Sequence, residues 1–193
     1  MKCCYKMKKT FLSILCFFFI KVGFSQQDVR YQPSFDGDSE ALFQMIDGYF
    51  SIEEIVTVSQ ANKSDLYQRA IRWTVIRYRS AKDVIQLEDS INSEIIVKGQ
   101  LQSSCWKRKM DIDHTLNIMC KDGKYRVIVN QLFITIHNYV NGADYTFSGS
   151  IEKIKLTNKE KQQLFKCVRE AVDNLLENIN NSMQEKIKVK DDW

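Results

Sequence analysis

The strongest constraint on the fold is a strict two-residue alternation in residues 110–120. Apolar side chains and one histidine occupy every second position, with polar residues between them (Met110, Ile112, His114, Leu116, Ile118 and Cys120 against Asp111, Asp113, Thr115 and Asn117). A period of two places successive side chains on opposite faces of a β-strand. Asp122-Gly123, a favoured hairpin turn, follows, and then a run rich in β-branched residues at 125–136. The chain is therefore expected to contain an antiparallel sheet with one buried face.

Further strands are predicted from the same period, at residues 42–46, 49–58, 84–88 and 95–101. The first two would form a hairpin, because Asp47-Gly48 lies between them. Residues 102–109 are predicted to form a polar, basic connection. Residues 137–156 are predicted to form a loop with one short strand at 145–147.

Two amphipathic helices are predicted, one before and one after the main strands. The first would begin at Asn62 or Ser64, and its apolar stripe has helical spacing (Tyr67, Ala70, Ile71, Thr74, Val75 and Tyr78). The second, at 158–187, opens with Thr157 and Glu160, which match a capping box. Its stripe is longer (Leu164, Phe165, Val168, Ala171, Val172, Leu175, Leu176 and Ile179).

The first helix also carries four arginines around Trp73. Arg69, Arg72 and Arg79 fall opposite the apolar stripe, and Arg77 lies on a flank. Such a pattern is typical of a solvated helix face. A nucleic-acid-binding stripe is disfavoured, because the aromatic residues that would stack on bases lie mostly on the buried side.

These elements predict an α+β domain over residues 41–187. Its curved antiparallel sheet would carry the two amphipathic helices on one face. The other face would be solvated or covered by a partner. Residues 26–40 are expected to form a flexible N-terminal arm and 188–193 a frayed tail.

Residues 1–25 have the features of a secretory signal peptide. A positively charged start is followed by an apolar run and by small residues up to Ser25. The apolar run is shorter than the roughly 20 residues that a bilayer-spanning helix needs. We therefore expect cleavage near Ser25, from a start at Met1 or Met7, and a periplasmic or secreted protein without a transmembrane anchor.

Removal of this segment changes the net charge. The whole chain has 28 Lys and Arg against 24 Asp and Glu, and five of the lysines but none of the acids lie in residues 1–25. The mature chain would therefore have 23 basic against 24 acidic residues, a net charge of about −1. A near-neutral chain has no overall field that would attract nucleic acid, so no nucleic-acid partner is predicted.

Three cysteines would remain after cleavage, namely Cys105, Cys120 and Cys167. An odd number excludes a fully paired disulfide framework. One bridge, for example Cys105–Cys120, and buried free thiols are both compatible with the sequence. No pair has C-x-x-C spacing, which argues against a structural zinc site.

Several stretches together carry a family resemblance. They are Asp47-Gly48, Lys63-Ser64-Asp65-Leu66-Tyr67, Trp73, Ser80-Ala81-Lys82-Asp83-Val84-Ile85-Gln86, Ile95-Ile96-Val97-Lys98-Gly99 and Asp122-Gly123-Lys124-Tyr125-Arg126-Val127. Over residues 41–136 the chain resembles the domain of unknown function numbered 4468, an uncharacterised family described as having a TBP-like fold. The resemblance implies export from bacteria with a Gram-negative envelope. It implies no activity, and DNA binding does not follow from a likeness of fold.

The sequence contains no recognised catalytic, metal-binding or phosphate-binding motif, so no catalytic residue, metal or cofactor is predicted. Asp111 and Asp113 share one strand face and could hold a cation or a proton, although a solvated face is the favoured interpretation. His114 is expected in the core and His137 in an exposed loop. An envelope hydrolase built on the two aspartates is the alternative hypothesis.

The best candidate binding feature is Trp106 with Lys107, Arg108 and Lys109, an aromatic residue in a basic segment. It would bind an anionic glycan or an envelope protein. The simpler interpretation is a solvated connection with its tryptophan packed down. The sequence thus favours an exported, non-catalytic binding or assembly module.

Overall fold

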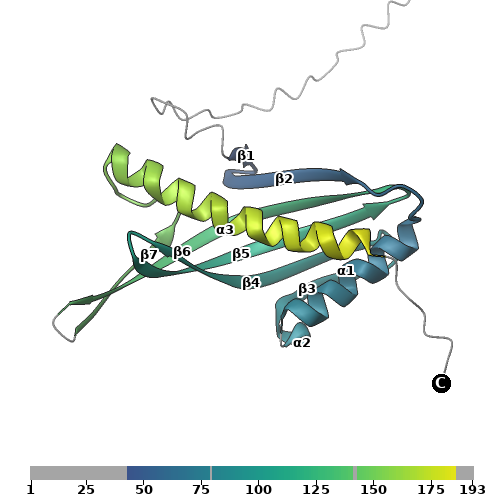
Figure 1. The fold of residues 1–193 in the computed structure, drawn as a ribbon, viewed down its shortest axis with the longest axis horizontal. Coiled ribbons are helices and arrows are strands. Elements are labelled where there is room, and N and C mark those ends of the chain that lie inside the picture. The colour runs from purple at the N-terminus through teal and green to yellow at the C-terminus, as the bar shows by residue number, and fades with distance from the viewer. Residues whose placement is uncertain (1–42, 79, 141–142, 186–193) are drawn as a thin grey trace, which may run out of the picture. The chain divides into compact units, whose positions relative to one another are not determined.

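The computed structural model describes residues 43–78, 80–140 and 143–185, and a seven-stranded antiparallel sheet runs through these residues (Figure 1). Its strands are β1 (Gln44–Ile46), β2 (Tyr49–Thr57), β3 (Ile85–Asp89), β4 (Glu94–Cys105), β5 (Arg108–Lys121), β6 (Lys124–Val140) and β7 (Ala143–Ser150). The order across the sheet is β1-β2-β6-β5-β4-β3, and β7 also pairs with β6. The predicted signal peptide, N-terminal arm and frayed tail lie outside the described residues.

The central strand is β6. Along one edge it pairs with β5, and along the other it pairs first with β2, up to Ile52 beside Val129, and then with β7. One additional residue lies in β6 near Gln131, which has a positive φ of 52°. A bulge of this kind bends a strand and increases its twist, which curves the sheet here.

Both long helices, α1 (Lys63–Arg77) and α3 (Asn158–Gln184), cover the same face of the sheet, whereas α2 (Ala81–Val84) is a single short turn (Figure 1). Both long helices begin at capping residues that the sequence predicts. Asn62 caps α1 by accepting a hydrogen bond from Asp65 N at 2.8 Å, and the predicted capping box of Thr157 and Glu160 opens α3. The predicted α+β class, with two helices on one face of the sheet, is confirmed.

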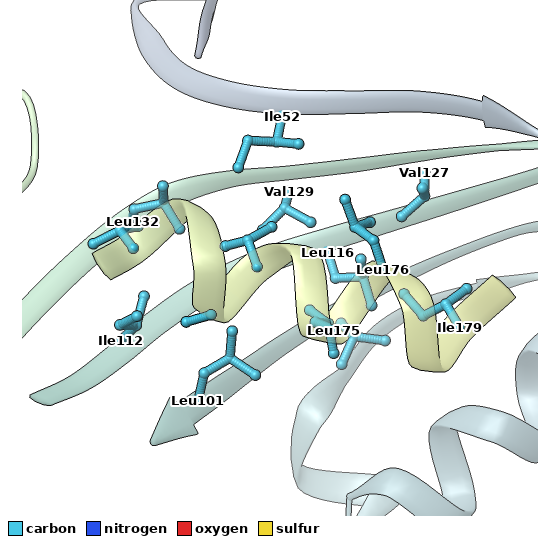
Figure 2. Packing of buried hydrophobic residues seen from close by; sticks show 14 of the residues in the cluster. Ile52, Leu101, Ile112, Leu116, Val127, Val129, Leu132, Leu175, Leu176 and Ile179 are labelled. Atoms are coloured by element: carbon cyan, nitrogen blue, oxygen red, sulfur yellow. The ribbon is translucent and has the colours of Figure 1, made fainter. Parts of the chain in front are cut away.

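The core lies between α3 and the sheet. Figure 2 shows Leu175, Leu176 and Ile179 of α3 next to Leu116 and Val129 of the central strands, and all five residues are buried. Burying one such side chain stabilises the fold by about 1.5–3 kcal/mol. The alternation predicted for β5 is confirmed, because its apolar positions and His114 are all buried.

The buried side of α1 differs from the prediction at Arg69. This residue is buried, and its Nη1 donates a hydrogen bond to the backbone carbonyl of Met183 at 2.6 Å. Trp73 is also buried, with its Nε1 donating to Asn178 Oδ1 at 2.8 Å, whereas Val75 is exposed. The reason is that α3 covers this flank of α1, and a period of 3.6 residues alone does not reveal a neighbouring helix.

The loop predictions were also wrong in part. Residues 102–105 continue β4, and residues 137–140 continue β6 into a hairpin with β7. Polar residues fill the exposed positions of these strands, and that composition resembles a loop.

The proposed Cys105–Cys120 bridge is wrong. Cys105 forms a disulfide with Cys167 of α3, with a Cα–Cα distance of 5.8 Å, and Cys120 is free and buried. Cys105 and Cys120 lie at opposite ends of the β4–β5 ladder, since Cys105 pairs with Arg108 while Met119 pairs with Glu94. The bridge ties the last residue of β4 to the first half of α3.

Candidate functional site

The Trp106 segment is a tight hairpin turn. Trp106 and Lys107 alone connect β4 to β5, with φ values of 52° and 60°. A two-residue turn with two positive φ values is most often Asn-Gly, because a Cβ in the left-handed region costs roughly 1–2 kcal/mol per residue. The chain therefore holds a tryptophan and a lysine where the backbone favours smaller residues.

The hairpin presents its four candidate residues differently. Trp106 is half-buried and packs against the hydrophobic core, whereas Lys107, Arg108 and Lys109 are exposed. The disulfide at the adjacent Cys105 joins this end of the hairpin to α3. The turn is thus anchored on one side by packing and on the other by a covalent bond.

Trp106 and Arg108 line a groove of about 480 Å³, which we call the Trp106 groove. Its wall comes from β6, β7, the segment that leads into α3 and the first turn of α3. The complete lining is Trp106, Arg108, Ile136, Asn138, Thr146, Phe147, Leu156 and Glu160. Four of these residues are apolar and four are polar, and apolar surface with polar groups that orient a ligand is common in binding sites.

The sequence around the groove is basic. Residues 106–109 contribute three Lys or Arg, and residues 153–161 contribute four, against the single acid Glu160. The Glu160 carboxylate accepts hydrogen bonds from Thr157 N at 3.0 Å and from Thr157 Oγ1 at 2.7 Å. The groove therefore combines apolar lining residues with a basic neighbouring sequence.

Phe147, Asn138 and Leu156 are groove residues that the sequence interpretation missed. Phe147 pairs with Ile136 across β6 and β7, which places it on the helix-covered face, yet it remains 41% exposed. Its exposure arises because the groove lies beside it. The alternation of Tyr145 and Phe147 with polar neighbours was a local signal for this strand, but only the fold brings it beside Trp106.

The two aspartates on β5 have separate partners. Asp111 Oδ2 lies 2.9 Å from His137 Nε2, and Asp111 Oδ1 lies 3.6 Å from Lys109 Nζ. Asp113 is exposed and accepts a hydrogen bond from Gln100 Nε2 at 2.9 Å. The prediction of an exposed loop histidine at 137 is wrong, because β6 extends to this residue and half-buries it.

His114 lies on the opposite face of the sheet from these aspartates. It is buried, and burial lowers the pKa of His114 to about 4. Its Nε2 lies 3.1 Å from the hydroxyl of Tyr78, and burial raises the pKa of Tyr78 to about 12. Both groups are therefore neutral near pH 7, and His114 is a core residue that does not join Asp111 and Asp113.

A second hollow, of about 460 Å³, lies at the start of α1 and has a polar lining that includes Lys63, Tyr67 and Asp122. A backbone amide at the start of α1 already has a hydrogen-bond partner within the chain. The Asp122 carboxylate accepts a hydrogen bond from Lys63 N at 2.7 Å. This hollow is therefore less suited to a ligand than the Trp106 groove.

Two further properties concern only the described parts of the chain. Within residues 43–78, 80–140 and 143–185, no three His, Cys, Asp or Glu side chains gather as metal ligands would. No helix in these residues is long and apolar enough to cross a membrane.

Comparisons with known proteins agree on the fold. The chain is similar to a TBP-like protein from Parabacteroides distasonis, with a TM-score of 0.61, 15% identity, and coverage of 75% of this chain and 99% of the other. It is also similar to a DUF4468 family protein from Bacteroides ovatus, with a TM-score of 0.54, 13% identity, and coverage of 79% and 98%. At these identities the likeness concerns the fold alone. No curated protein matches the chain significantly in sequence.

One protein-family model matches the sequence over residues 53–135, from β2 into β6. This range contains α1, the Trp106 turn and the hairpin of β5 and β6. The resemblance predicted from the sequence is confirmed, because residues 53–135 match the model of the domain of unknown function (DUF4468) with TBP-like fold.

Proposed function

We propose that the protein is an exported cell-envelope component that acts as a non-catalytic binding or assembly module through the Trp106 groove. One observation carries this proposal: a tryptophan and a lysine occupy a two-residue turn with positive φ at the edge of the groove. Residues held in unfavourable backbone conformations concentrate at functional sites. The partner would be an envelope protein or a glycan.

Export is supported by two features. Residues 1–25 have the charge and apolar pattern of a signal peptide, whose removal near Ser25 would release a periplasmic or secreted protein. The Cys105–Cys167 disulfide is typical of proteins that fold in oxidising compartments.

A binding role is favoured over hydrolysis by the separation of the candidate acids. Asp111 is paired with His137 and Lys109, and Asp113 is bound by Gln100. His114 is buried on the other face of the sheet. A carboxylate-based hydrolase would require these groups to converge on one substrate.

The test is photo-crosslinking in the cells that produce the protein. A photoreactive residue is placed at Lys107, and the matched control carries it at Lys121, which is exposed beside the turn at the opposite end of β5. We expect one dominant adduct from position 107 that disappears with Arg108→Ala, and none from position 121. Equal adducts at both positions, or none at 107, would contradict a binding role for the groove.

The same samples test export. The intact mass of the purified protein should correspond to a chain that begins at Gln26. A mass that includes residues 1–25 would contradict the proposed cleavage.

A further inference from the structure

We propose that the occupant of the Trp106 groove is an extended, acidic segment of a partner protein, which pairs as an additional strand with the outer edge of β7. This inference rests on the proposed binding function of the groove and specifies the chemistry of its partner.

One edge of strand β7 is unpaired among the described residues. Strand β7 pairs with β6 along its whole length, from Ala143 beside Val140 to Ser150 beside Phe133. Among the described residues no strand pairs with its other edge. Exposed edge strands are usually protected by charges or proline, but β7 contains only one charged residue, Asp144, and no proline. Its backbone is therefore open to strand addition.

The side chains of β7 alternate between the two faces of the sheet. Phe147 lies on the helix-covered face of β7 and lines the groove. Side chains of neighbouring antiparallel strands share faces in register, so a strand added to β7 would direct every second side chain to the helix-covered face, on which Phe147 lines the groove. The apolar lining residues, which include Ile136 and Leu156, would receive the stems of these side chains.

The groove lining contains one cationic side chain, Arg108. Arg108 lines the groove and is exposed, and within the described residues no hydrogen bond or ion pair engages its guanidinium. Glu160, the acid in the lining, is held by Thr157. A carboxylate on the incoming strand would therefore find a guanidinium that the Glu160 carboxylate does not bind, and a guanidinium binds carboxylates with two parallel hydrogen bonds.

The alternatives fit less well. A second copy of this chain would bring its own basic segments against those of the first, and like charges repel. An acidic glycan would satisfy the charge but would leave the backbone of the β7 edge unused. A polypeptide uses the β7 edge, the apolar lining residues and the Arg108 charge together.

The experiment uses the full mature protein and a blocked, fluorescent peptide of roughly ten residues that alternates valine with glutamate. Two matched peptides serve as controls: one with lysine in place of glutamate, and one with the same side chains but N-methylated central amides, which cannot pair as a strand. Oligogalacturonate is the acidic glycan probe. Binding of the fluorescent peptides is measured by fluorescence anisotropy. Binding of the unlabelled oligogalacturonate is measured by its ability to displace the fluorescent peptide.

We expect saturable binding of the valine–glutamate peptide that weakens at least about tenfold in three cases: after N-methylation, with lysine in place of glutamate, and in the Arg108→Glu variant. The Lys121→Glu variant, with the same charge change at the other end of β5, should bind unchanged.

Equal affinity for the N-methylated peptide would overturn strand pairing. Binding of oligogalacturonate in place of the peptide, or of neither probe, would overturn the acidic polypeptide as the occupant. An intact crosslink from position 107 in that case would preserve the proposed binding function, so the two failures are distinguishable.

Discussion

Gly99 lies directly against the ring of Tyr78, so closely that a Cβ at position 99 would be 2.8 Å from Tyr78 Cζ. Gly99 pairs with His114 across β4 and β5, and the Tyr78 hydroxyl lies 3.1 Å from His114 Nε2. The absence of a side chain at Gly99 makes room for the tyrosine, and the tyrosine satisfies the buried imidazole. The three residues form one unit on the helix-covered face.

Replacing Gly99 should therefore be costly. We expect Gly99→Ala to lower the free energy of unfolding by about 1–3 kcal/mol, because the methyl group forces the Tyr78 ring to move in a packed core. Urea unfolding measures the effect. Gly149→Ala is the control, since a Cβ there would meet Ile154 Cγ1 at an ordinary 3.5 Å. Equal stability of the two variants would show that the Tyr78 ring is not closely packed.

The buried imidazole of His114 predicts that the free energy of unfolding depends on pH. Burial lowers the pKa of His114 from 6.5 to about 4, so the unfolded chain binds this proton more readily than the folded one. The contribution of His114 to stability is thus complete above about pH 6.5 and is lost as the pH falls toward 4. The shift corresponds to about 2–3 kcal/mol by pH 4.5.

His114→Gln isolates this effect, because glutamine does not titrate. Urea unfolding of both proteins at pH 7 and pH 4.5 should show a larger loss of stability in the native sequence than in the variant. If both proteins lose the same amount of stability between pH 7 and pH 4.5, His114 is not the cause of the pH dependence.

The strained turn predicts a stabilising substitution. Lys107 has a φ of 60°, a conformation that glycine adopts without steric cost, so Lys107→Gly should raise the free energy of unfolding by about 0.5–1 kcal/mol. Lys109→Gly removes the same charge from within β5 and should lower the free energy of unfolding by a similar amount. Thermal unfolding compares the two variants, and destabilisation by both would argue against strain in the turn.

The disulfide predicts that the stability of the fold depends on redox conditions. The 62-residue separation of Cys105 and Cys167 corresponds to a stabilisation of about 4 kcal/mol from restriction of the unfolded chain. A reducing agent should therefore shift the urea midpoint of the native sequence and of Cys120→Ala downward, and should leave that of Cys167→Ala unchanged. A midpoint of Cys167→Ala that still responds to the reductant would place the bridge elsewhere.

Local patterns predicted the elements whose signals lie within a few residues. The alternation of β5, the Asp47-Gly48 and Asp122-Gly123 turns and the Thr157 capping box each depend on the preferences of neighbouring residues alone. His114 was placed correctly in the core because it shares the face of the apolar residues of β5. The family resemblance also arose from such short stretches.

The sequence by itself thus determined the α+β class, the buried face of the central hairpin and the start of each long helix. Tertiary structure alone decided that Cys105 meets Cys167, that Arg69 reaches Met183, and that Phe147 lies beside Trp106 in one groove. The physical reason is distance along the chain. Hydrophobic periodicity specifies which face of an element is buried, whereas the neighbour that covers this face depends on strand order and helix placement.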